Sequence, residues 1–325
     1  MPTATINAKA LGPRLFGNLR LWFIADASGI DGSDPLADRV EWSRVIPFVA
    51  MHLMCFAVIW VGWSAAAVTA AVAAYLVRMF AITGFYHRYF SHRSFKTSRS
   101  MQFVLGLAGA AAVQRGPLWW AAHHRHHHAH SDGPADQHSP AQRGFWRAHM
   151  GWFLTRKGFA PDLRRVRDLR RFPELRWLDR FDIAVPVVLA YGMLSLGRYL
   201  QTHAPELHTT GWQMLVWGFF ISTVACYHGT YTINSLSHVF GRQRYRTGDD
   251  SRNNWFLALL TLGEGWHNNH HHYPAAARQG FYWWELDITY YLLKCLSWLG
   301  LIWDLKPVPR AVRDSHACPG PRLEP

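Results

Sequence analysis

Histidine is the residue type whose number and spacing first suggest chemistry in this sequence. The stretch WWAAHHRHHHAHSD holds six histidines within the eight residues from His123 to His130. Three further motifs also contain histidines: HRYFSH (His87–His92), NSLSH (Asn234–His238) and HNNHHHYP (His267–Pro274). Imidazole is a frequent ligand of zinc, copper, iron and nickel. The motifs therefore predict a metal centre.

Two of the motifs contain the pattern HxxHH, formed by His124, His127, His128 and by His267, His270, His271. Residues at positions i, i+3 and i+4 share one face of a helix. Each triplet is therefore expected to present three imidazoles to one point. The register of the first triplet stays open on spacing alone, because His123, His126 and His127 spell the same pattern.

The other two motifs have different spacings. His87 and His92 are five residues apart and do not share a face of an α-helix, which favours a position across a helix end. Asn234 and His238 are four residues apart and do share a face. The Asn234 amide is a candidate holder of a metal-bound water.

The number of ligands favours a particular metal chemistry. HRYFSH contributes two histidines, each HxxHH pattern contributes three, and NSLSH contributes one, which gives nine imidazoles. A zinc ion takes only three or four protein ligands. Two metal ions of higher coordination number would use them, and imidazole-rich sites suit iron among the redox metals. Soluble di-iron bundles use Glu and Glu-x-x-His ligands instead, and that motif is absent from the long apolar segments. The count predicts an all-nitrogen di-iron centre.

Four apolar segments are long enough to position these motifs at one face of a membrane: 45–63, 64–83, 183–200 and 212–231. Arg78 and Arg198 interrupt the second and third, so a buried helical hairpin in a soluble protein is the alternative. Of the 34 Lys and Arg residues, 17 lie between His87 and Arg180, and the connection Gln201–Gly211 has none. Positive residues mark cytoplasmic loops. The N-terminus, residues 87–182 and everything after Tyr231 are therefore predicted to be cytoplasmic, together with every histidine motif.

These observations predict an all-α, multi-pass integral membrane protein with four transmembrane helices and a cytoplasmic helical cap that carries the di-iron site. Its expected parts are an N-terminal cytoplasmic segment (1–44), a membrane domain with the cap (45–274) and a C-terminal cytoplasmic segment (275–325). The net charge of +13 is explained by anionic headgroups or a phosphate-bearing substrate, and no nucleic acid is expected. The four scattered cysteines form no CxxC pair, which argues against a disulfide framework or a thiolate zinc site.

In their order and spacing, HxxxxH, HxxHH, NxxxH and HxxHH resemble the membrane fatty-acyl desaturases. GEGWHNNHH and NSLSHVFGRQRY resemble the acyl-CoA Δ9 (stearoyl-CoA) branch, and the resemblance runs from about Val45 to Pro274. HRHHH aligns with the His-Arg-x-His-His of this family, which favours His124 over His123. The resemblance implies that Asn234 holds a metal-bound water and that nine histidines bind two iron ions: His87, His92, His124, His127, His128, His238, His267, His270 and His271.

The resemblance also implies an activity. It implies an O₂-dependent enzyme that introduces a cis double bond, at the Δ9 position, into a long-chain acyl thioester such as acyl-CoA. The His-Pro-Gly-Gly signature of a fused cytochrome b5 is absent, so electrons are expected from a separate ferredoxin or cytochrome b5-type donor and its reductase. Two alternatives stay open: a hydroxylase with the same di-iron site, and a histidine-rich membrane metal transporter.

By position, five residues resemble those that line the acyl tunnel in this family. Gln114, Trp120 and Thr230 fall where the tunnel bends, and Tyr75 and Met79 fall at its far end. Ordinary packing is the alternative for all five. The basic run Arg164–Arg180 either binds an anionic carrier such as coenzyme A or flanks the third span.

The remaining histidines receive plainer interpretations. A solvated surface is expected for His123, His126, His130 and His272, with hydrogen bonding to metal ligands as the alternative. A structural or exposed position is expected for His52, His203, His208 and His316. Three histidines match no motif although they lie nearer to the motifs, and no role is predicted for them: His138, His149 and His228.

Overall fold

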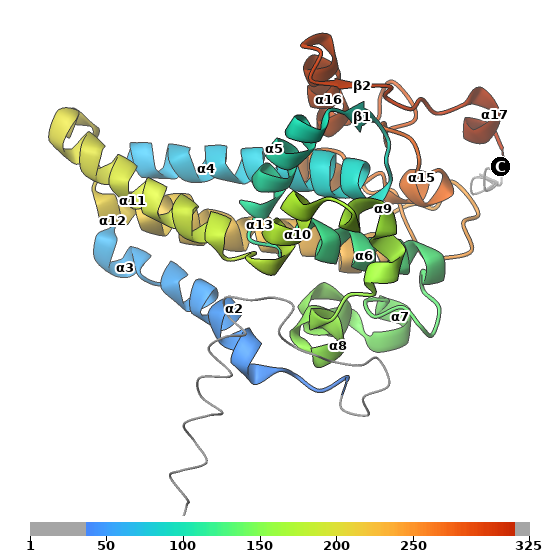
Figure 1. The fold of residues 1–325 in the computed structure, drawn as a ribbon, viewed down its shortest axis with the longest axis horizontal. Coiled ribbons are helices and arrows are strands. Elements are labelled where there is room, and N and C mark those ends of the chain that lie inside the picture. Colours follow the sequence, from blue (N-terminus) through green and yellow to red (C-terminus); the bar gives the residue numbers. More distant parts are fainter. Residues whose placement is uncertain (1–36, 316–325) are drawn as a thin grey trace, which may run out of the picture.

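The structure is a computed structural model that describes residues 37–315, so His316 lies outside the described residues. Its regular structure is mostly helical, as predicted, and its one small sheet pairs β1 (Lys96–Thr97) with β2 (Ile302–Trp303) antiparallel. Long helices lie side by side, and shorter helices gather at one end of them (Figure 1).

The first two long helices run in opposite directions, and each packs against the later rod formed by residues 211–235. α2 (Trp42–Cys55) and α3 (Val58–Val61) make one rod, and α4 (Ala65–Phe80) returns and runs directly into the π-helix η3 (Ala81–Ser91). Gly62 has φ +67°, which only glycine adopts readily at the reversal, and the Ser64 side chain caps α4 by accepting from Ala67 N–H. Residues 42–61 and 65–91 are both long and apolar enough to cross a membrane. The second helix continues past the predicted span end at Thr83.

The later long helices agree less well with the four predicted spans. α10 (Pro173–Arg180) and α11 (Ala184–His203) pass the same length and hydropathy test only together, across a bend of 67°. α12 (Gly211–Leu215), η8 (Val216–Ile221) and α13 (Ser222–Ser235) follow one another as a further rod, but this rod is not among the apolar candidates. Residues 37–315 therefore hold two or three candidate spans.

The polar side chains of the 211–235 rod explain this result. Ser222 and Thr223 are buried and accept hydrogen bonds from the Arg78 guanidinium, with 2.6 Å between Arg78 Nη1 and Thr223 Oγ1. Arg78 Nε also donates to Ala74 O at 2.9 Å. Mean hydropathy counts these groups as polar, yet they satisfy one another between two helices. Arg78 is thus compatible with a position inside the bundle.

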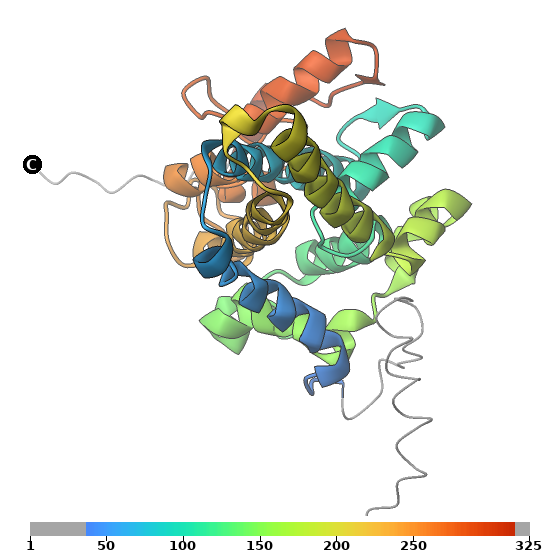
Figure 2. The ribbon, with the colours of Figure 1, turned by 90° about the vertical axis from the view of Figure 1, so that its left-hand side faces the viewer.

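Short elements build a cap from residues 92–182 and 236–315. Its first half contains α5 (Arg99–Ala110), α6 (Pro117–His130), α7 (Pro140–Arg143), η4 (Arg147–Gly151), η5 (Trp152–Leu154), α8 (Arg156–Phe159), η6 (Leu163–Val166) and α9 (Arg167–Arg170). Its second half contains η9 (Leu236–His238), α14 (Trp255–Leu260), α15 (His267–His272), α16 (Ile288–Trp298) and α17 (Arg310–Arg313). At the opposite end of the long helices, η7 (Pro205–Leu207) lies between α11 and α12. Figure 2 looks at the molecule from this opposite end, with the cap behind the long helices.

The core joins the long helices to the cap. Tyr86 and Phe90 of η3 are fully buried with Leu105 of α5 and Leu118 of α6. A side chain at Gly109 would lie 2.0 Å from the Tyr86 ring, so α5 needs glycine there to approach η3. This close packing fixes α6, the helix with six histidines, against the end of the second long helix.

Candidate metal centre

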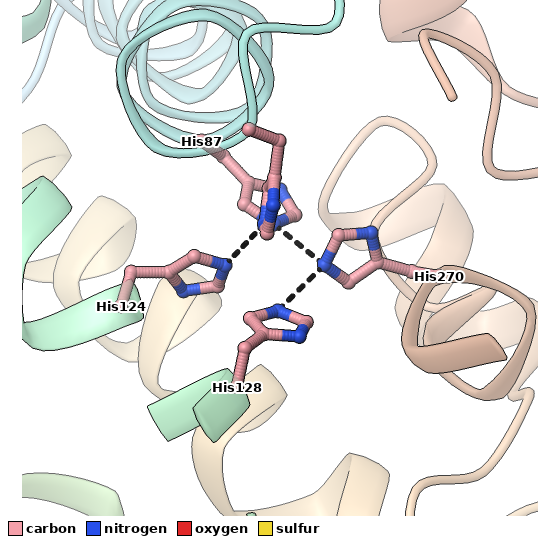
Figure 3. A group of neighbouring side chains, drawn as sticks. His87, His124, His128 and His270 are labelled. Carbon is pink, nitrogen blue, oxygen red and sulfur yellow. Dashed lines mark hydrogen bonds between the residues drawn. The ribbon is translucent and has the colours of Figure 1, made fainter. Parts of the chain in front are cut away.

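The structure brings the histidine motifs together in two buried groups. Within each group, one ligand atom per residue lies within 4.8 Å of all the others. The first group contains His87, His92, His124, His128 and His270, and the second contains His127, His238, His267 and His271. Figure 3 shows His87, His124, His128 and His270 of the first group turning their ring nitrogens toward a common centre. All nine histidines named from the sequence lie in these groups.

The expectation that each HxxHH triplet faces one point is wrong. α6 contributes His124 and His128 to the first group but His127 to the second, and α15 contributes His270 to the first group and the rest of its triplet to the second. Adjacent helix residues point about 100° apart, so His127 and His128 diverge. Both helices therefore lie along the boundary between the groups.

His87 and His92 meet because of the π-helix. Residues five apart diverge on an α-helix, but the π-helix has i→i+5 hydrogen bonds, and His92 N–H donates to His87 O at 3.3 Å. Their ring centroids lie 5.0 Å apart. His92 is also the C-cap of η3, so the predicted helix end is present as well.

The ring nitrogens within each group are close together. The Nε2 atoms of His92 and His124 lie 2.8 Å apart, and those of His128 and His270 lie 2.9 Å apart. In the second group, the Nε2 atoms of His238 and His267 lie 3.0 Å apart. Such inward-facing nitrogen atoms are positioned as ligands.

Four carboxylates that the sequence analysis did not identify lie behind the imidazoles. Each contacts the Nδ1 atom of one histidine, in the pairs His127–Asp136 (2.9 Å), His238–Asp132 (2.8 Å), His271–Asp249 (2.6 Å) and His87–Glu264. An N–H that donates to a carboxylate leaves the Nε2 lone pair free to face a metal. A local signal existed, because every one of these carboxylates lies within a few residues of a histidine motif or in the loop after one.

Protonation in the site follows from burial and these contacts. Burial, and then the neighbouring histidines, lower the pKa of His124, His128 and His270 well below the ordinary value. Burial alone would raise the pKa of Asp136 and Asp249, but the adjacent histidines outweigh it and hold both carboxylates well below the ordinary value. His124, His128 and His270 are therefore neutral, the state in which imidazole binds a metal. Burial would lower the pKa of His127 as well, but Asp136 and the other nearby carboxylates raise it above the ordinary value.

The donor set fits two metal ions. Nε2 of His271 is buried without a hydrogen-bond partner, although Nδ1 of the same ring contacts Asp249. A buried polar atom without a partner costs free energy, which a metal–ligand bond would recover. Five nitrogens in one group and four in the other exceed the needs of a single tetrahedral zinc.

A cavity of about 370 Å³ lies beside the first group. Gln114, Trp120, Thr230 and Asn234 are among its lining residues, together with His124. The Gln114 amide donates to Thr230 Oγ1 at 2.9 Å, and the Trp120 ring stacks on His124 at 5.0 Å. The three residues expected at the tunnel bend thus lie together next to the histidines.

A smaller cavity of about 40 Å³ lies beyond Trp120 and Thr230, and Met79 lines it. Tyr75 is not among its lining residues. The Tyr75 hydroxyl donates to Leu260 O at 2.6 Å, and it approaches Gly229 beside the Met79 methyl group. Of the two residues expected at the far end, only Met79 therefore borders the space.

The surface expectation for His123 is wrong. His123 is 7% exposed and packs on Trp119 and Trp152, which shield it because it points away from the outer face of α6. His123 and His138 both line the larger cavity. His130 is exposed as expected. His272, half-buried, stacks on Tyr245 with 4.0 Å between ring centroids.

Three other histidines form a separate hydrogen-bonded row. His52 Nδ1 donates to Phe48 O at 2.8 Å, and its Nε2 lies 3.2 Å from His228 Nε2. His228 Nδ1 lies 3.0 Å from His149 Nε2. Each nitrogen faces a different partner, so these three rings do not converge on one point.

The chain is mostly helical, contains helices long enough to cross a membrane, and brings its histidines together in two groups. These features fit the class of histidine-rich membrane metalloenzymes. The family model of the fatty acid desaturases matches residues 60–296. The chain is 36% identical over 271 residues to an sn-1 stearoyl-lipid 9-desaturase of Anabaena variabilis, covering 82% of this chain and 94% of the relative. It is 36% identical over 290 residues to an acyl-CoA 5-desaturase of Anemone leveillei, covering 84% of each. A palmitoyl-monogalactosyldiacylglycerol delta-7 desaturase of Arabidopsis thaliana is 36% identical over 274 residues, covering 82% of this chain and 69% of the relative.

The chain belongs to the fatty acid desaturase family. It is accordingly an oxidoreductase of fatty-acyl groups, which confirms the resemblance drawn from the histidine motifs.

Proposed function

We propose that the protein introduces a cis double bond at the Δ9 position of a long-chain acyl group, using O₂, two iron ions and external electrons. The observation that carries this proposal is the pair of converging imidazole groups beside a largely apolar cavity. The Δ9 position is supported by the 9-desaturase relative. The relatives' names divide between lipid-bound and coenzyme A-bound acyl chains, so identity alone does not select the carrier.

Each histidine group would hold one iron ion. His87, His92, His124, His128 and His270 would bind the first, and His127, His238, His267 and His271 would bind the second. Asn234, which lines both cavities, would bind through a water. When bound, the two ions supply the O₂ activation and redox chemistry that removes two hydrogens from a saturated chain.

The protein's own residues would orient the reactants. The four carboxylates fix the rings of His87, His127, His238 and His271, so that the ligand positions are set before the metal binds. Trp120 borders both cavities and stacks on His124. An acyl chain that passes Trp120 and the Gln114–Thr230 hydrogen bond would have one methylene pair beside the first group. Apolar lining elsewhere keeps water away from that position.

The same proposal includes a membrane topology. The 211–235 rod would be a fourth span, since its polar side chains Ser222 and Thr223 face Arg78 inside the bundle. The cap and both termini would be cytoplasmic, in line with 17 of 34 basic residues between His87 and Arg180. A separate ferredoxin or cytochrome b5-type donor, supplied by its reductase, would dock on the cap.

Expression in a desaturase-deficient host tests this function. Gas chromatography–mass spectrometry of the host lipids should show new cis-Δ9 acyl chains. His270→Ala should abolish them, while His130→Ala, which replaces an exposed histidine at the end of α6, should retain them. An alcohol in place of the alkene would indicate a hydroxylase. Bound zinc or nickel without an O₂-dependent product would indicate metal transport.

A further inference from the structure

The larger cavity reaches the outer surface of the long helices. Its wall includes Met51 of α2 and Val187 and Ala190 of α11. α11 packs on α12 and α2 packs on η8, whereas α2 and α11 make few contacts with each other. Val187 is 56% exposed. The cavity therefore opens sideways between α2 and α11.

The surface around this opening is apolar. The exposed side chains next to it on both helices are Ile46, Val49, Leu53, Val188 and Tyr191. An apolar surface on helices of membrane-spanning length faces lipid. A chain that enters between α2 and α11 would therefore come from the bilayer.

The cavity has a polar part where these helices meet the cap. Arg115 and Asp182 line it, with 3.1 Å between Arg115 Nη1 and Asp182 Oδ2. The guanidinium also lies 4.9 Å from the centre of the Phe159 ring. Nε and Nη2 of Arg115 are buried without hydrogen-bond partners. Two unpaired guanidinium donors indicate a missing acceptor, such as an ester carbonyl or a phosphate oxygen.

Two histidines extend this polar part. His123 Nε2 is likewise buried without a hydrogen-bond partner, and His123 lines the cavity. His138 also lines the cavity, but its Nδ1 faces the Asp136 carboxylate, 3.8 Å from Oδ1. A ring nitrogen that carries its proton can donate a hydrogen bond to an ester oxygen.

The exposed basic run contributes nothing to this cavity. Arg164, Arg167, Arg170 and Arg171 are exposed, and no basic residue between Arg164 and Arg180 is among the described residues that line it. The phosphates of coenzyme A would find these cations on the outer surface of the cap and not in the cavity.

We infer that the substrate is an acyl chain esterified to a membrane glycerolipid, which slides into the cavity between α2 and α11. Arg115 and His123 bind oxygens of its ester and headgroup region at the level of the cap. This inference rests on the proposed function, deepens it by naming the carrier, and replaces the thioester expected from the sequence.

Photo-crosslinking tests the inference without requiring turnover. The full-length protein is placed in phosphatidylcholine nanodiscs that contain a phosphatidylcholine with a diazirine in its acyl chain. Crosslinks should map to peptides that line the cavity, and excess stearoyl-CoA should not displace them. Val187→Trp, which narrows the opening, should lower the yield at least fivefold. Val188→Trp is the matched control, since Val188 is 70% exposed and does not line the cavity.

A second variant tests the polar part. Arg115→Met should lower the crosslink yield about fivefold while the thermal midpoint shows that the protein stays folded. The inference is overturned if stearoyl-CoA displaces the lipid probe, or if Val187→Trp and Val188→Trp behave alike. Failure of the proposed function has a different signature, namely normal lipid crosslinking with no alkene in the host lipids.

Discussion

Asp132→Asn should weaken iron binding at the second histidine group alone. Asp132 Oδ2 accepts from His238 Nδ1 at 2.8 Å and from Asp250 N–H at 2.9 Å, and Oδ1 accepts from Ser139 Oγ at 2.6 Å. Burial would raise the pKa of Asp132, but these hydrogen bonds hold it at about 2. The carboxylate is therefore ionised at neutral pH.

The size of the effect follows from these contacts. Asp132 has φ +54°, which asparagine tolerates, and its amide can keep the carbonyl toward His238 and the NH₂ toward Ser139. The charge is lost, and the Ser139 contact reverses so that the Ser139 hydroxyl accepts instead of donating. A hydrogen bond to a charged group contributes about 1.5–3 kcal/mol and a neutral one about 0.5–1.5 kcal/mol, so the His238 contact weakens by about 1 kcal/mol. Since 1.4 kcal/mol is tenfold, iron should bind roughly fivefold more weakly at this group.

A chelator titration followed by metal analysis of the purified protein measures this change. Wild type should release two irons, and Asp132→Asn should release one of them at a roughly fivefold lower chelator concentration while the other is unchanged. Asp162→Asn is the control, because Asp162 pairs with Arg164 at the surface. Unchanged release of both irons, or equal weakening of both in a folded protein, would refute the reasoning that Asp132 supports only the second group.

Three further predictions concern the tunnel, the metals and the topology. Met79→Ala should shift the products toward longer chains without moving the double bond. Gly229→Ala should shift the products toward shorter chains, because the added Cβ of residue 229 would lie 2.8 Å from the Met79 methyl group. Gas chromatography measures the chain lengths. A chelator should lower the thermal midpoint by roughly 5 °C, since a ligand at a hundredfold its Kd stabilises by about 2.7 kcal/mol, and added iron should restore it. A reporter at the C-terminus should be cytoplasmic and one in the 201–211 connection external; the reverse readings would contradict the proposed topology.

Short sequence patterns were enough to name the nine histidines that the structure brings together. The nine histidines were identified because their spacing is fixed within short motifs, and the residues around the bend because their positions relative to these motifs resemble those of the desaturases. Two of the carboxylates were missed because their partners are distant: Asp132 contacts His238 across 106 residues and Glu264 contacts His87 across 177. Asp136 lies only nine residues from His127, but the bend of the chain that brings them together is not visible in the histidine spacing. The burial of His123 depends on Trp152 of another element. Hydropathy likewise missed that polar groups of the 211–235 rod pair with Arg78.

The division of the histidines between two groups has a consequence for how the site is built. α6 and α15 each supply ligands to both groups, so the separation of the two metal positions is set by the pitch of rigid helices and not by loops. The carboxylates behind the second group lie outside these helices, at positions 132, 136 and 249. A substitution on α6 or α15 that shifts the helix must therefore disturb both groups, whereas a substitution at one of these loop carboxylates acts mainly on the single ring that it holds. The loops can vary one histidine group at a time, while α6 and α15 keep the two groups aligned with each other.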